Sequence, residues 1–293
     1  AADNIAIGHD AMRLTTTGNY NIGVGTDALR ANTTGANNTA VGKEALDATT
    51  GSANVGIGSA AGGGITSGAY NVAVGNDTLL GTCTGEYNTT VGYGAGQVVT
   101  SGTSNTCVGD RAGFAVTSGS NNLLLGNDAG RTGSPGGNIA TGSNESVWGD
   151  ENITNAYIQV DWTVSSDERD KTDFTALDLG LNFVNALEPL TYKWDKRSKY
   201  GDKDATDYDL NDQTPDGTHK EDWLDIGFKA QAVLALEEAA GYKIADKKNL
   251  TVSLTEDEKS YGLQYSKFVP ILVKALQEAD DKIDALTARV AAL

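Results

Sequence analysis

The sequence is poor in the residues that normally fill one large globular core. Among 293 residues there are four Trp, five Phe, one Met and only four Pro. The two cysteines, Cys83 and Cys107, form no CxxC pair and have no histidine close by in the sequence. These features argue against a disulfide framework and a zinc site, and we expect two free thiols.

Basic residues and long apolar runs are also scarce. The chain has 22 Lys and Arg against 39 Asp and Glu, for a formal net charge of −17. Without a cluster of basic side chains to neutralise phosphates, we expect no nucleic-acid partner. No apolar run reaches the roughly 18 to 20 residues of a membrane span, and no export signal is recognisable, so we expect no membrane insertion.

Metal and cofactor ligands are not grouped in the sequence. The histidines, His9 and His219, are isolated, and the acidic loop Asp202–Asp216 lacks the spacing of an EF-hand. We therefore predict no metal and no cofactor, with a calcium ion in that loop as the alternative.

Glycine is abundant instead, and 30 of the 36 glycines precede residue 150. In the same region asparagine recurs at intervals of 17 residues, with one interval of 16, and opens a short apolar run each time. These asparagines are Asn4, Asn21, Asn38, Asn54, Asn71, Asn88, Asn105 and Asn122. Such a period predicts a stack of coils, in which the asparagines form hydrogen-bonded ladders from coil to coil.

Each place in the repeat has its own residue type. The third place after Asn is β-branched or Leu, as in Val41, and we expect it to face inward. The second place, as in Ala40, is mostly small, and we expect it to face a neighbouring chain. From Asn21 onward a glycine also precedes each Asn by three residues, as in Gly35, and we expect corners with positive φ there. The pattern over residues 4 to about 140 resembles the β-roll repeats of trimeric adhesin heads and phage fibre shafts, and this implies a trimeric β-solenoid stalk over residues 1–140.

A neck or linker is predicted over residues 141–165. Within it, Ala156–Val164 alternates as a β-strand, and the charged run from Ser165 to Phe174 follows. Beyond this point several motifs occur in a set order. They are Ser166, Asp167, Arg169 and Lys171; then Leu187, Pro189, Tyr192 and Trp194; then Gly227, Phe228, Ala230 and Gln231.

These motifs resemble the self-cleaving intramolecular chaperone of phage endosialidases and tail spikes, a module shared with the myelin regulatory factors. The resemblance implies an α+β chaperone domain over residues 166–268, with Ser166 as nucleophile and Lys171 as its base. The resemblance also implies a cut at one of the two bonds that flank Ser166, and we expect the bond between Ser165 and Ser166. The cut should happen once and need no external substrate. Burial would lower the pKa of the lysine enough for it to accept a proton.

Two features depart from the family pattern. Asp170 stands where an apolar residue is usual, and residues 200–221 look like an insertion. Asp167 and Arg169 belong to the motif as supporting residues.

Residues 269–293 carry apolar residues at alternating steps of three and four. They are Val269, Leu272, Leu276, Ala279, Ile283, Leu286, Val290 and Leu293. This heptad pattern predicts a helix that forms a trimeric coiled coil.

The predicted function is that of a virion tail fibre or spike, made in the host cytoplasm as a homotrimer. A host-cell glycan or receptor is a further partner that such a fibre could bind. Two alternatives stay open, a trimeric glycan-binding adhesin and a structural stalk whose cleavage has been lost. An adhesin would need a C-terminal membrane anchor, whereas this sequence ends in heptads.

Overall fold

The computed structural model describes residues 2–293, and contacts within the chain divide it into two compact units. The first unit runs to Thr154 and also contains Lys196–Pro215. The second contains Asn155–Asp195 and Asp216–Leu293. The predicted boundary before Ser166 follows the cleavage motif rather than the contacts, and it stays a prediction.

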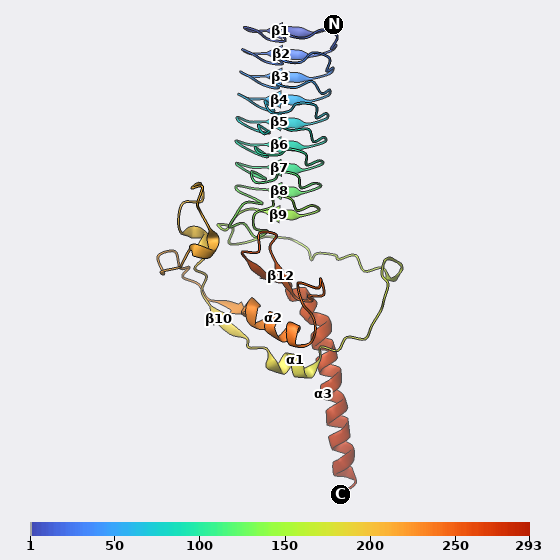
Figure 1. Cartoon of the computed structure of the whole chain (residues 1–293). Helices are drawn as coiled ribbons and strands as arrows, with labels where there is room; N and C mark the ends of the chain where they lie inside the picture. Colours follow the sequence, from blue (N-terminus) through green and yellow to red (C-terminus); the bar gives the residue numbers. More distant parts are fainter. Residues whose placement is uncertain (1) are drawn as a thin grey trace. The chain divides into compact units, whose positions relative to one another are not determined.

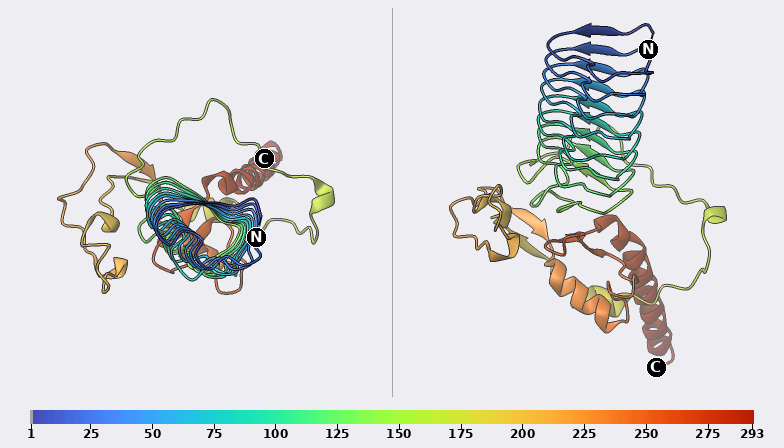
Figure 2. Two further views of the ribbon diagram at one scale, coloured as in Figure 1. Left: turned by 90° about the horizontal axis from the view of Figure 1, so that it is seen from above. Right: turned by 45° about the horizontal axis from the view of Figure 1, so that its top comes forward.

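The first unit is a β-solenoid, as the repeat predicts. Its nine three-residue strands form one parallel sheet in sequence order, and successive coils lie over one another (Figures 1 and 2). The strands are β1 (Ile5–Ile7), β2 (Ile22–Val24), β3 (Thr39–Val41), β4 (Val55–Ile57), β5 (Val72–Val74), β6 (Thr89–Val91), β7 (Thr106–Val108), β8 (Leu123–Leu125) and β9 (Ser146–Trp148). Equivalent places of consecutive repeats are paired, for example Ala40 with Gly56 and Val41 with Ile57.

The repeated asparagines form the predicted ladder. The side-chain oxygen of Asn88 accepts the backbone N–H of Asn105 at 3.0 Å, and its amide nitrogen donates to the carbonyl of Gly102 at 2.9 Å. The same pair of bonds recurs along the stack, and Asn88 and its neighbours in the column are fully buried. Each asparagine therefore satisfies backbone groups of the next coil that would otherwise be unpaired.

The prediction of which strand residues face inward was wrong. The second place lies inside the coil, where Ala40, Ala73 and Cys107 are fully buried, whereas at the third place Val41 is 39% and Ile57 42% exposed. The interior of the coil is narrow and already holds side chains from the turns, so most residues at the second place are small, and Leu124 is a buried exception. Cys83 and Cys107 have free thiols, as predicted, and both side chains are buried.

Side chains from the turns fill the rest of the interior, and their sizes are complementary. Leu46 is fully buried, and a Cβ on Gly62 in the following coil would approach its Cδ2 to 2.7 Å. Where glycine takes the place of this leucine, a buried residue three positions later fills the space, as in Gly62 with Ile65.

Positive φ was predicted for the glycines before the asparagines, and this prediction was wrong. Gly85 is absent from the residues with positive φ, and that conformation falls instead on the residue just before each Asn, such as Tyr87 at 61°. A Cβ on Gly85 would lie 1.9 Å from the carbonyl oxygen of Gly102 in the next coil. Close contact between coils therefore requires glycine here.

The repeat continues past residue 138 in altered form. The coil before β9 is longer, and the N–H of Glu145 bonds to Asn122 Oδ1 at 2.9 Å, so Glu145 stands where an asparagine would. The strand predicted at Ala156–Val164 is not formed. One chain offers this segment no strand to pair with, and it leaves Tyr157, Val160, Trp162 and Val164 exposed.

The second unit is a small α+β domain. It contains α1 (Leu181–Ala186), α2 (Ala230–Ala239) and α3 (Phe268–Ala291), and two antiparallel hairpin-like pairs. These pairs join β10 (Leu190–Tyr192) to β11 (Asp225–Gly227) and β12 (Val252–Leu254) to β13 (Tyr261–Leu263). Its core consists of Leu179, Phe183, Val233, Val252, Phe268 and Ile271.

Helix α3 forms over the predicted heptads. Its Phe268, Ile271 and Ala275 are buried, whereas Leu276 is 72% and Val290 69% exposed. The heptad residues thus form an apolar stripe that the single chain does not cover. Among the described residues, no helix combines the length and the apolar character needed to cross a membrane.

The ladder predicts a local stability cost. Replacing Asn88 by Ala removes the acceptor of the Asn105 N–H and the donor to the Gly102 carbonyl, both in a buried setting. We expect Asn88→Ala to lower the free energy of unfolding by roughly 2 to 4 kcal/mol in urea titrations. The control is Asn76→Ala, because the Asn76 side chain is exposed and bonds only locally to Asp77. Equal losses in both variants would contradict the role of the ladder.

Candidate functional site

The predicted site residues lie in the segment that joins the solenoid to α1. It runs over residues 155–178 as an extended loop with one 3-10 turn, Glu168–Asp170 (Figure 1). Asp167 begins this turn, and its side chain accepts the N–H of Arg169 at 2.9 Å. The turn reverses the chain and so brings Lys171 back toward Ser166.

Ser166 and Lys171 are in direct contact. The Lys171 Nζ donates to Ser166 Oγ at 2.5 Å and to the Ser166 carbonyl oxygen at 3.3 Å. A hydroxyl hydrogen-bonded to an amine is the arrangement that an activated serine requires, because the amine can take the hydroxyl proton once it is neutral. The contact is consistent with the predicted roles of the two residues, which stay predictions.

The expected burial of Lys171 is not present in the single chain. Ser165, Ser166 and Lys171 are all exposed. A lysine can act as a base only when it is neutral, and apolar surroundings favour that form. The geometry of the pair is therefore present without the apolar surroundings that its chemistry needs.

The supporting residues pair with each other. Arg169 Nη2 lies 2.6 Å from Asp167 Oδ2, and its Nε bonds to Asp167 Oδ1 at 3.0 Å. The hydrogen bonds from Arg169 hold the pKa of the Asp167 carboxyl below its usual range. The pair thus joins the residue that caps the turn to a residue within it. Asp170, which departs from the family pattern, is the last residue of the turn and is exposed.

The later motifs meet around β10 and β11. Trp194 Nε1 donates to Asp225 Oδ2 at 3.1 Å, and Tyr192 packs edge-on against Trp194 at 5.2 Å between ring centroids. Phe228, just after β11, stacks on Phe268 at 5.5 Å. Motif segments far apart in the sequence are thereby joined into one domain. Asp225 was not anticipated, since nothing marks its pairing in the sequence.

A buried carboxylate was also not predicted from the sequence. Glu237 on α2 is fully buried and accepts the backbone N–H groups of Leu250 at 3.0 Å and Thr251 at 2.7 Å. These bonds satisfy the carboxylate and attach the segment before β12 to α2.

The alternative of a calcium ion in the acidic loop gains no support from the described residues. No group of three or more His, Cys, Asp or Glu within residues 2–293 is arranged to hold a metal ion. Asp204, one of its carboxylates, is instead bonded to Arg111.

Comparison with known protein families identifies one segment. Residues 166–242 match the Peptidase S74 family, described as the chaperone of endosialidase. The match covers less than half of the chain, begins at Ser166 and includes α1, α2, β10 and β11. The match implies a chaperone-of-endosialidase domain of the self-cleaving peptidase type in this segment, and it supports an intramolecular chaperone role. Searches of the curated proteins and of the solved structures found no match to the chain.

The Asp167–Arg169 pair predicts a titration shift. The arginine stabilises the carboxylate, so the contact is present at neutral pH and is lost as the pH falls through the lowered pKa of Asp167. In Arg169→Gln the pKa of Asp167 should rise toward its usual value, measured by carboxyl NMR titration in a Ser166→Ala background. Arg289→Gln, an exposed change on α3, is the control. An unchanged midpoint in Arg169→Gln would show that the pair does not form.

Proposed function

We propose that the chain is part of a trimeric bacteriophage tail fibre or tail spike whose C-terminal domain assists folding of the stalk and then cuts itself off between Ser165 and Ser166. The observation that carries this proposal is the 2.5 Å contact between Lys171 Nζ and Ser166 Oγ at the first residues of the matched chaperone domain. The β-solenoid directly before it supplies a stalk that such a chaperone would serve. The virion setting rests on the resemblance to tail-spike chaperones.

The proposed reaction is an internal acyl transfer followed by hydrolysis. Neutral Lys171 takes the proton of Ser166 Oγ, and the oxygen attacks the carbonyl carbon of Ser165. The C–N bond between Ser165 and Ser166 breaks, and the proton goes to the departing amine. Water then hydrolyses the ester, so each cut consumes one water molecule and yields residues 1–165 and 166–293. The site lies within the chain it cuts, so each molecule reacts once.

Exposed apolar surface supports a trimer. On the strands, Ile7 is 60% and Ile57 42% exposed, and on α3 the heptad residue Leu286 is 56% exposed. Columns of β-branched residues along a stalk and an apolar stripe along a helix are surfaces that proteins normally cover. Association of three copies along both elements would cover them.

A chaperone follows from the topology of the stalk. All nine strands are parallel, and each pairs with a strand one coil away in sequence. No single coil can bury its apolar residues alone, so the stack lacks a local nucleus, and its end coils expose unpaired strand edges during folding. The backbone hydrogen bonds of helix α3 are local, so the helix can form early and associate through its exposed heptad residues.

Assembly would also supply the burial that the site lacks. In the single chain Lys171 is exposed, and so are the apolar residues Tyr157, Trp162 and Val164 just before the site. When three chains pack together, these side chains can surround the serine and lysine and exclude water. Cutting would then follow assembly.

The catalytic assignment predicts the behaviour of two single variants. Ser166→Ala should abolish cutting. Lys171→Arg should slow it at least about 100-fold, because arginine keeps the positive charge but does not release its proton. Both are measured by the appearance of fragments on denaturing gels.

Two variants serve as controls. Ser165→Ala and Lys193→Arg should be cut at the parental rate, since Ser165 supplies only its carbonyl and Lys193 lies outside the segment from Ser166 to Lys171. Cutting of Ser166→Ala would exclude the nucleophile, and normal cutting of Lys171→Arg would exclude the lysine as base.

Cutting should also increase kinetic stability. Once the chaperone is severed, an unfolded stalk lacks its assembly nucleus, and cut and uncut forms share the same stalk contacts. We expect the Ser166→Ala trimer to melt at a similar temperature but to dissociate more readily in hot detergent than the cut trimer. Equal detergent resistance of the two forms would contradict this.

A further inference from the structure

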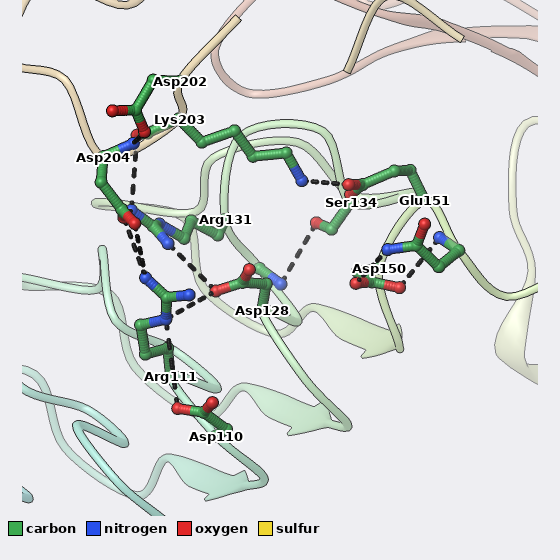
Figure 3. A network of polar contacts seen from close by, with 12 residues as sticks. Asp110, Arg111, Asp128, Arg131, Ser134, Asp150, Glu151, Asp202, Lys203 and Asp204 are labelled. Carbon is green, nitrogen blue, oxygen red and sulfur yellow. Dashed lines mark hydrogen bonds and ion pairs between the residues drawn. The ribbon is translucent and has the colours of Figure 1, made fainter. Parts of the chain in front are cut away.

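The apparent insertion in the chaperone domain is attached to the solenoid. Residues 196–215 belong to the same compact unit as the stalk, although they follow Ser166 in the sequence. Figure 3 shows the charged groups that join them, from the loop at Lys203 and Asp204 to the stalk at Arg111, Arg131 and Glu151.

Asp204 is held by two arginines of the stalk. Arg111 Nη1 donates to its two carboxylate oxygens at 2.9 and 3.1 Å, and Arg131 Nη2 donates to Oδ1. Asp128 lies between the arginines, 3.4 Å from Arg111 Nε and 3.1 Å from Arg131 Nη1. The hydrogen bonds from Arg131 and Arg111 keep the pKa of Asp204 below its usual range. Arg131 is further fixed over the ring of Phe114, 5.0 Å from its centroid.

A second set of contacts lies at Glu151. Its carboxylate pairs with Lys203, and its backbone carbonyl accepts from Lys196 Nζ at 2.7 Å. Close packing accompanies the charges, because a Cβ on Gly133 would lie 2.7 Å from the Cβ of Ser198, which is buried. The loop is thus bound through both charge and shape.

The arginine pair exists only on a folded stalk. Arg111 and Asp128 are 17 residues apart and occupy the same place in consecutive coils. Arg131 follows in the second of these coils. Only when the two coils are stacked do Arg111 and Arg131 reach one carboxylate. Asp204 therefore distinguishes stacked coils from an unfolded chain.

We infer that residues 196–215 anchor the cut domain to the last stacked coils of the stalk, so that the two pieces stay joined after the Ser165–Ser166 bond is broken. The inference rests on the proposed cutting for its role, because both sides of this contact survive that cut unchanged. The partner surface is the mixed-charge site of Arg111, Asp128, Arg131 and Glu151.

The anchor should respond to salt. Asp204 has 59% of its side chain exposed and Arg111 28%. Charges at this exposure are screened within about 10 Å at 0.1 M ionic strength and within about 3 Å at 1 M. Release at high salt is the expected signature of an anchor made of such pairs.

The test uses the full chain with a recognition sequence for an added protease inserted between Ser165 and Ser166, in the Ser166→Ala background. The folded protein is cut by the protease, so the result does not depend on self-cutting. Size exclusion in 50 mM and 1 M NaCl then reports whether fragment 166–293 elutes with the stalk. Asp204→Asn removes the charge that both arginines bind, and Arg111→Gln removes one of the two stalk arginines that bind it. Asp207→Asn, an exposed change in the same loop, is the matched control.

The parent and Asp207→Asn should co-elute with the stalk at 50 mM NaCl and separate at 1 M. Asp204→Asn should weaken retention at least about tenfold, measured as the apparent Kd, and Arg111→Gln should weaken it in the same direction. Separation of the parent pieces at 50 mM would overturn the anchor, as would retention that neither salt nor Asp204→Asn changes. Absence of self-cutting in the wild-type chain would sink the proposed reaction but leave this result standing.

Discussion

Hydrogen bonding from one coil to the next is the constraint on which the stalk depends. A three-residue strand cannot form alone, and the backbone groups at its corner are satisfied by an asparagine that belongs to the neighbouring coil. The same closeness excludes a side chain at Gly85, and the leucines and isoleucine from the turns leave room for mostly small residues, such as Ala73, on the inner face of the strands. Each coil is therefore stable only when it is stacked on another coil. The first coil to form has no neighbour to stabilise it.

Because the coils need help to start stacking, the stalk depends on the domain that follows it in the sequence. The strand face and α3 both leave apolar residues uncovered, and the segment before Ser166 does the same. In the proposed order, α3 associates first, the coils then stack, and the surroundings of Lys171 close last. An exposed lysine in the single chain fits this order, because a competent site before assembly would remove the chaperone before its work was done.

The regular parts of this structure could be predicted from the sequence, because they depend on period and spacing. The solenoid, the asparagine ladder and the terminal helix all follow from residues at fixed intervals, whereas the pairing of Ser166 with Lys171 was expected only from the resemblance to the chaperone family. The facing of Val41 and Ala40 could not be predicted, because alternation along a strand gives two faces without saying which is inside. Which face lies inside depends on Leu46 and Ile65, whose side chains fill the interior of the coil from its turns. The contact of Asp204 with Arg111 spans 93 residues, and no periodicity predicts such a contact.

Denaturing mass spectrometry of the freshly purified wild-type protein tests the central claim most directly, because it identifies the cut bond and the extent of cutting together. The expected result is two masses, for residues 1–165 and 166–293, that sum to the intact chain plus one water. A single mass at the full 30.4 kDa, or a cut at a bond that does not adjoin Ser166, would contradict the claim.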